Sequence, residues 1–312
     1  MERKKIVIWL KSSQKETFTT VYHKGASYRQ FADRLAARNH LFFAYDAGSY
    51  RGDDIFYPLY RYAHGEIAVD GEKIKADVIY NLGNIPGEDF STDTARISNT
   101  PAFKKFFALK FNVYNLLPEF FPKMFFVDNE AHFREALEKI ATSKVVLKPN
   151  TGTGGVGVKI FEKAATPVLD EAMKKTIANG ALLQEFMDTK NGITGICESY
   201  HDLRLAVVNG TIALTHVRIP ESGSLIANYQ QGATIKELAR EDLPEKIITL
   251  REKVHAKIAG RFPNPMYTMD VGVNADGDPL LFEINGTTAF PWPEFESRDF
   301  FIEQLAVHLE NS

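Results

Sequence analysis

Short apolar runs alternate with stretches of helical spacing in the first hundred residues of the chain. Continuous apolar runs at 6–10, 40–45 and 76–80 predict buried strands. Between the first two runs, residues 28–38 carry their apolar positions on one side and predict a helix. Two shorter runs, 67–69 and 72–74, flank Asp70-Gly71 and predict a hairpin. Strands that alternate with helices favour an α/β lobe with a largely parallel sheet.

The tripeptide Asn99-Thr100-Pro101 predicts the start of a helix, with Asn99 or Thr100 as its N-terminal cap. Helical spacing then continues from Phe103 to Tyr114. Two hairpin signals come later, one around Asn209-Gly210 and one around Ala275-Asp276-Gly277. The remaining patterns predict helices at 129–141, 169–178, 242–259 and 300–309, strands at 145–147, 158–161 and 181–186, and hairpins at 203–217 and 267–284.

Length and composition are those of a folded protein with more than one lobe. The chain has 312 residues, of which 44% are hydrophobic and 12% aromatic, and this length suits two or three lobes. The 37 basic and 40 acidic residues leave a net charge of −3, so the basic excess of a nucleic-acid-binding protein is missing. The single cysteine, Cys197, excludes a disulfide within the chain.

The apolar positions give no sign of a membrane protein. The first apolar run has five residues before Lys11, which is too short for the core of a signal peptide. No run approaches the length that spans a membrane. We therefore expect a cytoplasmic protein with neither a membrane nor a nucleic acid among its partners.

A glycine-rich stretch follows the strand predicted at 145–147. Lys148 stands at the end of this strand, and four glycines lie between positions 152 and 157. Glycines let backbone N–H groups approach phosphate oxygens, and a lysine adds a point charge. Because strand signals flank the stretch and the Walker pattern is absent, we interpret it as a hairpin lid over phosphates. A flexible turn with an incidental lysine is the alternative.

Three oxygen-bearing side chains lie near the ends of the hairpin predicted at 267–284. Glu283 and Asn285 share one face of their strand because side chains alternate with a period of two. Cross-strand pairing around the turn brings Asp270 close to them. Two carboxylates and an amide oxygen suit Mg²⁺. An edge hairpin with solvated carboxylates is the alternative, although the apolar residues around them imply that each carboxylate needs a partner.

Other charged residues carry weaker signals. Arg204 and Arg218 stand at the two ends of the hairpin predicted at 203–217, and arginine suits bidentate contacts with phosphate or carboxylate. Surface ion pairs are the alternative for both. Lys110 lies in a helix that is otherwise aromatic, where a surface lysine is the plainer interpretation. Residues 182–188 form an apolar strand that ends in acidic groups.

The order of these features resembles the ATP-grasp superfamily, most of all its glutathione-synthetase-like and ribosomal-protein glutamate ligase branches. The resemblance covers residues 99–290. It implies an ATP-grasp fold: an N-terminal α/β pre-ATP-grasp lobe at 1–98, followed by two α+β lobes, at 99–182 with the glycine-rich loop and at 183–312 with the metal site, which clasp ATP.

The resemblance also assigns roles to individual residues. Lys110 and Lys148 correspond to the lysines that contact the nucleotide, and Arg204 to the arginine near the transferred phosphate. Arg218 and Asn228 fall where relatives place substrate or phosphate contacts. The implied nucleotide-binding set is completed by Thr151, Gly152, Thr153, Gly154, Gly155, Val156 and Gly157 in the loop, by Glu185, Phe186 and Met187 at the adenine, and by Asp188 at the ribose. The implied metal triad is Asp270, Glu283 and Asn285. The implied catalytic set is Arg204, Lys148 and Arg218.

Two segments depart from the family pattern. After Asn285 the chain reads Gly286-Thr287-Thr288, where relatives often have a Ser or Thr followed by a Pro-Gly turn. Residues 219–232 also have a pattern of their own. The identity of the substrates therefore cannot be copied from a relative.

The resemblance implies a ligase with ATP and Mg²⁺ as cofactors, with Mn²⁺ as a possible substitute. A small-molecule or peptide carboxylate attacks the γ-phosphate to give an acyl phosphate, and an amine then displaces phosphate to form an amide or peptide bond. Two alternatives stay open: a non-catalytic ATP-binding or regulatory protein of the same fold, and a kinase that stops at phosphoryl transfer. The sequence indicates neither the two substrates nor the oligomeric state.

Overall fold

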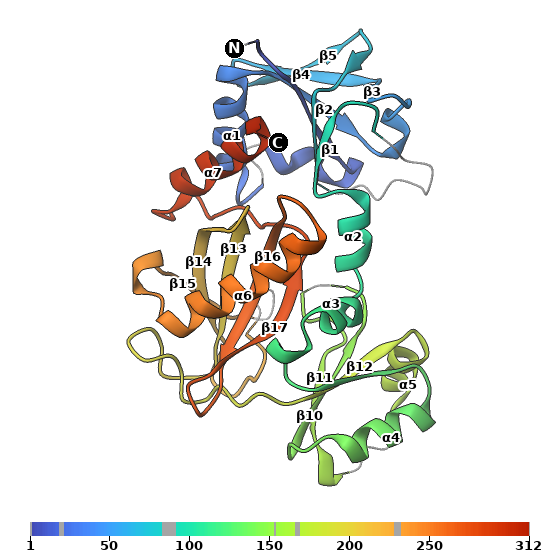
Figure 1. Cartoon of the computed structure of the whole chain (residues 1–312), viewed down its shortest axis with the longest axis vertical. Coiled ribbons are helices and arrows are strands. Elements are labelled where there is room, and N and C mark those ends of the chain that lie inside the picture. Colours follow the sequence, from blue (N-terminus) through green and yellow to red (C-terminus); the bar gives the residue numbers. More distant parts are fainter. Residues whose placement is uncertain are drawn as a thin grey trace.

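The computed structural model describes residues 2–18, 22–82, 92–152, 154–165, 169–227 and 232–311. Three sheets with their helices follow one another along the long axis of the molecule (Figure 1). The first sheet lies at one end with both chain termini, the third sheet lies in the middle, and the second sheet lies at the other end. Short 3-10 helices also occur, at Ser12–Phe18, Ala47–Ser49, Pro118–Phe120, Lys163–Ala165 and Arg240–Asp242.

The first sheet is parallel at its centre and antiparallel at one edge. β1 pairs in parallel with β2 and β7, and β7 pairs in parallel with β8. β4 and β5 extend the sheet beyond β2 in antiparallel pairing. The prediction of a largely parallel sheet is confirmed. Its elements are β1 (Lys5–Leu10), α1 (Gly25–Arg38), β2 (His40–Tyr45), β4 (Leu59–Ala63), β5 (Glu66–Asp70), β7 (Val78–Asn81) and β8 (Arg96–Ser98).

The hairpin predicted around Asp70-Gly71 is wrong. β5 pairs with the preceding strand β4 across His64-Gly65, whose φ angles of 52° and 82° are both left-handed, as a tight two-residue hairpin turn requires. The run after Asp70 leaves the sheet, because β6 (Ile74–Lys75) pairs with β3 (Ile55–Phe56) instead. The Asp70 carboxylate accepts the backbone N–H of Glu72 at 3.0 Å, which turns the chain locally without forming a hairpin.

The second sheet is antiparallel; α2 and α3 precede its strands in the sequence, and α4 and α5 lie between them. Thr100 caps α2 by accepting the backbone N–H of Phe103, as predicted. The helical run predicted from Phe103 to Tyr114 is divided at Ala108-Leu109, so that Lys110 begins a new helix. The elements are α2 (Pro101–Phe107), α3 (Lys110–Leu116), β9 (Met124–Val127), α4 (Glu130–Lys139), β10 (Lys144–Pro149), β11 (Lys159–Glu162), α5 (Glu171–Ala178) and β12 (Ala181–Glu185), with strand order β11-β10-β12-β9.

The third sheet, of order β15-β14-β13-β16-β17, has one apolar face and one polar face. Leu205 and Met269 share a buried core with Val254 of α6, which covers the apolar face. Because side chains alternate along a strand, Arg204 and Asp270 point to the opposite face. The predicted hairpins are both present. The elements are β13 (Asp202–Val208), β14 (Thr211–Ile219), β15 (Thr234–Glu237), α6 (Glu245–Arg261), β16 (Met266–Val273) and β17 (Pro279–Asn285).

The last helix, α7 (Arg298–Asn311), returns to the first lobe and packs beside α1 (Figure 1). Its Phe301 and Leu305 share one core with Phe31 of α1 and Leu214 of β14, so α7 connects the first and third sheets. The lobe boundaries at 98/99 and 182/183 stay a prediction. Within the part of the chain that the structure describes, no helix combines the length and apolar character needed to cross a membrane.

Candidate active site

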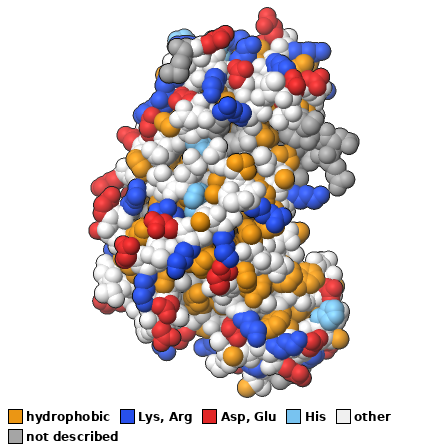
Figure 2. Space-filling view, in the orientation of Figure 1, with side chains coloured by type: hydrophobic (Ala, Val, Ile, Leu, Met, Phe, Trp, Pro, Cys, Tyr) orange, Lys and Arg blue, Asp and Glu red, His pale blue; other side chains and the backbone are white. Residues whose placement is uncertain are grey.

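A cavity of about 670 Å³ lies where the three lobes meet. The second lobe contributes β10, the glycine loop and the end of β12, the third contributes the polar face of its sheet, and the first contributes residues just before α1. Figure 2 shows the outline of the molecule indented where the second lobe joins the rest, with hydrophobic side chains gathered beside the indentation. The polar face of the third sheet is therefore a wall of this cavity.

The register of the third sheet aligns its charged residues in one row across the strands. His216 of β14 lies opposite Arg204 of β13, which lies opposite Asp270 of β16, and Asp270 lies opposite Glu283 of β17. Residues directly opposite one another share a face of the sheet. Asn285 lies one pair further along, opposite Thr268. The prediction that the turn brings Asp270 close to Glu283 and Asn285 is confirmed.

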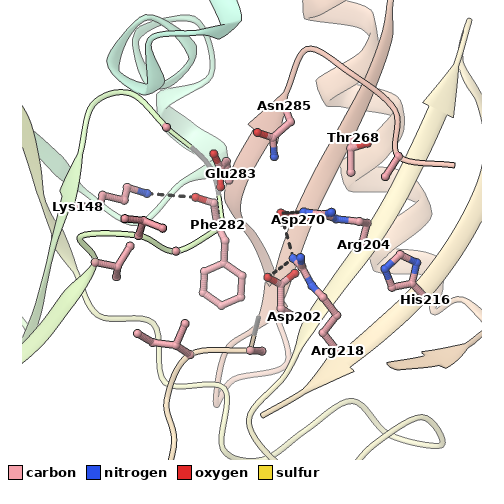
Figure 3. Close-up of a pocket in the computed structure, with 18 of the residues that line it drawn as sticks. Lys148, Asp202, Arg204, His216, Arg218, Thr268, Asp270, Phe282, Glu283 and Asn285 are labelled. Carbon is pink, nitrogen blue, oxygen red and sulfur yellow. Dashed lines mark hydrogen bonds and ion pairs between the residues drawn. The ribbon is translucent and has the colours of Figure 1, made fainter. Parts of the chain in front are cut away.

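Asp270 is the centre of a buried ion-pair cluster (Figure 3). Its Oδ1 accepts the Nε–H of Arg204 and its Oδ2 accepts an Nη2–H of Arg204, both at 2.7 Å. The Nη2 of Arg218 lies 3.0 Å from the same Oδ2. Burial alone would raise the pKa of Asp270, but the two guanidinium groups outweigh burial and hold it well below its usual range. Asp270 is therefore a carboxylate at neutral pH.

Asp202 and His216 complete this wall. Asp202 also pairs with Arg218, yet its Oδ1 is buried with no hydrogen-bond partner among the described residues. Burial raises the pKa of Asp202 to about 7 against the opposing effect of Arg218. Burial, helped by Arg204 and Arg218, lowers the pKa of His216 to about 3, so this ring is neutral at pH 7. The arginines therefore supply the positive charge on this face.

Two lysines face the row from the second lobe. The Nζ of Lys148 donates to the Phe282 carbonyl at 3.2 Å (Figure 3), and burial lowers the Lys148 pKa to about 8, partly offset by Glu283. The Nζ of Lys110, at the start of α3, lies 3.1 Å from Oε1 of Glu283 and donates to the Gly152 carbonyl. Sequence analysis selected both lysines, and the structure brings both into the cavity wall.

The glycine loop joins β10 to β11, which pair antiparallel, so the predicted hairpin is confirmed. Gly152, Gly154, Gly155 and Gly157 have φ angles of 94°, 76°, 70° and 77°, all in the left-handed region that favours glycine. A Cβ at Gly157 would lie 2.9 Å from Cγ of Pro149. Thr151, Gly152, Gly154, Gly155 and Val156 line the cavity, whereas Thr153 lies outside the described residues.

The segment after β12 only partly matches its predicted role. Phe186 and Met187 line the cavity, but Glu185 and Asp188 do not. Glu185 accepts the Ala141 backbone N–H at 3.0 Å, and Asp188 pairs with Lys190 at 3.2 Å. The predicted carboxylate contacts with the nucleotide therefore have no support in this geometry, because alternation along the strand turns Glu185 away from the cavity.

Sequence analysis missed several polar residues of the cavity, among them Asp202, His216, Gln184 and Lys24. Gln184 lines it on the same strand face as Phe186, and its buried Oε1 has no hydrogen-bond partner among the described residues. The period of two along β12 would have selected it. Lys24, just before α1, also lines the cavity, and no local signal marks it because the approach of the first lobe is a tertiary feature. Of the two predicted substrate contacts, Arg218 lines the cavity and Asn228 lies outside the described residues.

Residues 118–288, more than half of the chain, match the RimK-like ATP-grasp domain. This chain belongs to the RimK-like ATP-grasp family. A probable alpha-L-glutamate ligase of Pasteurella multocida (strain Pm70) is 25% identical over 169 residues, which cover 54% of this chain and 49% of that protein. The match with this curated relative thus spans about half of its length.

Solved structures extend the similarity to the whole chain. D-alanyl-alanine synthetase A from Vibrio cholerae superposes with a TM-score of 0.62 at 14% identity, over 100% of both chains. The ATP-grasp ligase PsnB, complexed with a variant of its minimal precursor, Mg and ADP, superposes with a TM-score of 0.60 at 11% identity, over 97% of this chain and 98% of PsnB. At these identities the likeness shows the fold, and the ATP-grasp fold predicted from the sequence is confirmed.

Proposed function

We propose that this protein is an ATP-dependent carboxylate–amine ligase that forms an amide or peptide bond through an acyl phosphate. The observation that carries the proposal is the row Arg204–Asp270–Glu283, which faces Lys148 across one cavity. Both cations and metal-ligating oxygens are needed where phosphoryl charge is transferred. The ligase names of the glutamate ligase relative and of the two synthetase and ligase structures agree with this chemistry.

In this proposal the lobes at 99–182 and 183–312 clasp ATP. Lys148, Lys110 and the backbone N–H groups of the glycine loop bind its phosphates. Phe186, Met187 and Phe282 are the apolar wall for adenine, and Gln184 offers an unpaired acceptor for its amino group. The exposed tip of the loop carries Val156, which is 76% exposed and lines the cavity, so closure of the loop over ATP would bury it.

The residues present fit Mg²⁺ by the chemistry of their donor atoms. Asp270, Glu283 and Asn285 offer two carboxylates and an amide oxygen on one face of the β16–β17 hairpin. Glu283 is paired with Lys110, so metal binding would exchange this partner. Among the described residues, no three or more His, Cys, Asp or Glu side chains are grouped so that they could hold a metal ion by themselves. When bound, the metal would neutralise phosphate charge.

The reaction consists of two displacements. A carboxylate oxygen of the acid attacks the γ-phosphorus of ATP, the bond to ADP breaks, and an acyl phosphate forms. The nitrogen of the amine then attacks the acyl carbon, phosphate leaves, and the amine releases a proton. Arg204 and Arg218 hold the developing negative charge. No nucleophilic side chain is needed, and burial raises the pKa of the Cys197 thiol, which keeps it unreactive.

Incubation with MgATP, hydroxylamine and a panel of acids tests this proposal. A ligase converts its acid to a hydroxamate with an equal amount of ADP. A stable phosphorylated product without hydroxamate would instead identify a kinase. ATP binding without ADP release for any acid would identify a non-catalytic ATP-binding protein.

A further inference from the structure

The first lobe supplies one part of the cavity wall, and this part is unlike the rest. Its residues are Tyr22, His23, Lys24 and Tyr28, and they meet Trp292 from the segment after β17. The ring of His23 lies 4.8 Å from the ring of Trp292. The wall is therefore aromatic, with one lysine at its centre.

Lys24 is a partly buried cation without a carboxylate partner. Its Nζ donates to the Phe290 carbonyl at 2.6 Å and lies 4.7 Å from the centre of the Trp292 ring. No carboxylate of the described residues forms an ion pair with it. Burial and the nearby Arg204 lower the pKa of Lys24 to about 8, against the opposing effect of Glu294. An ammonium group in such a position is costly unless an anion joins it.

The carboxylates on the wall of the third sheet pair with the arginines and not with Lys24. Asp270 is held by both arginines, and Asp202 is held by Arg218. His216, which Lys24 also influences, is neutral at pH 7. Both carboxylates are thus occupied by the arginines, and Glu294 acts on Lys24 without an ion pair between them among the described residues. An incoming ammonium is repelled here, whereas an anionic group is attracted.

We propose that the acid substrate carries a second anionic group, in the simplest case another carboxylate, and that Lys24 pairs with it while the reacting carboxylate lies beside Arg204. This inference rests on the proposed ligase function and adds the substrate class. The acid is favoured over the amine as the bearer of this group, because Lys24 lies close enough to Arg204 for their charges to interact, and the reacting carboxylate of the acid lies beside Arg204. Lys24 is then a residue that determines specificity.

A purely structural role is the competing explanation for Lys24. Its bond to the Phe290 carbonyl links the first lobe to the segment after β17, so it could serve only to hold the lobes together. Loss of such a link would affect all acids alike and would lower the melting temperature. Loss of a substrate contact would affect only acids with the second anionic group.

The test compares diacids with their half-amides, which keep the size and one reacting carboxylate but lose one charge. N-acetyl-L-glutamate, N-acetyl-L-aspartate and glutarate, each with its half-amides, are offered to the wild type with MgATP and hydroxylamine. We expect kcat/KM to be about 30-fold or more higher for the preferred diacid than for its half-amides. Lys24→Met should abolish this preference and leave the values for the half-amides and the KM for ATP unchanged. Lys73→Met, at an exposed position of the same lobe, is the control.

Charge reversal sharpens the result. Lys24→Glu should disfavour diacids further and favour acids with a cationic group, such as Nα-acetyl-L-lysine. Equal turnover of diacids and half-amides by the wild type would overturn the inference and leave the ligase function standing. An equal loss for every acid in Lys24→Met, with a lower melting temperature, would also overturn it. If the wild type releases no ADP with any acid, the proposed function itself fails, and this inference with it.

Discussion

The β10–β11 hairpin and the β16–β17 hairpin line the same cavity, but the first presents mainly backbone groups to it and the second presents charged side chains. The first presents a loop with four left-handed glycines and an exposed tip. The second presents Asp270, which is 3% exposed and held by Arg204 and Arg218. One hairpin therefore acts through its backbone, and the other through side chains that its neighbours hold in place.

In the proposed function, the two hairpins bind phosphate groups in two different ways. A glycine loop can close over a ligand because it has few contacts to lose. A buried ion-pair cluster cannot rearrange without exposing charge to an apolar environment, so it is organised before the ligand arrives. Lys148 lies between them, on the strand that leads into the loop and in contact with Phe282 of the rigid hairpin.

The largest effect is expected at the centre of the rigid hairpin. Asp270→Asn should lower kcat about a thousandfold, since it removes a metal-ligating charge and frees both arginines. It should also reduce the free energy of unfolding by about 3–5 kcal/mol, because buried arginines lose their partner. ADP release and urea unfolding measure the two effects. Asp278→Asn, at the exposed turn of the same hairpin, is the control and should change neither quantity. An active Asp270→Asn enzyme would refute the metal assignment.

A smaller effect is expected where the two hairpins meet. Lys148→Met should weaken ATP binding about 30- to 100-fold through the loss of a phosphate contact. The free energy of unfolding should not fall, because the variant removes a buried charge and keeps the side-chain volume. Calorimetric titration and urea unfolding provide the measurements. Lys139→Met, at an exposed position in the same lobe, is the control and should bind ATP normally. Equal affinities for the two variants would argue against a phosphate contact at Lys148.

The same lysine predicts a pH dependence. The pKa of Lys148 in the free protein is lowered to about 8, so its positive charge is present below pH 8 and is lost above it. The dissociation constant for ATP should therefore rise about tenfold for each pH unit above 8. Lys148→Arg, which stays charged, should remove this rise. Titrations from pH 6.5 to 9.5 test the expectation, and a wild-type profile that stays flat to pH 9.5 would contradict it.

The smallest effect is expected from replacing one glycine of each hairpin with alanine. Gly157 and Gly277 both have a φ angle of 77°, so alanine at either position should cost about 1–2 kcal/mol of stability. Only Gly157→Ala should also lower kcat, by about five- to tenfold, because it stiffens the loop and its Cβ meets Pro149. Gly277→Ala has open space around it and serves as the control. Similar kcat values for both variants would show that loop closure does not limit turnover.

Much of the fold was predictable because local pattern and tertiary structure agree. Both hairpins of the third sheet and the parallel strands β1, β2 and β7 of the first lobe lie where apolar runs and turn residues place them. The prediction around Asp70-Gly71 was wrong because two turn signals compete there, and strand pairing with β4 selects His64-Gly65. The break at Ala108-Leu109 also escaped prediction, because the aromatic spacing continues through it.

The sequence by itself determined which chemistry is available. Strand periodicity places Glu283 and Asn285 on one face, and the predicted turn between the strands brings Asp270 close to them. The glycine loop is recognisable from its residue types. Only the tertiary structure decided which charges are partners. The register of β13 against β16 places Asp270 opposite Arg204. Helix α7 packs beside α1 and connects the first lobe, which carries Lys24, to the third sheet. The physical reason is that a residue's partners depend on its burial and on strand register, which are set by the packing of segments far apart in the chain.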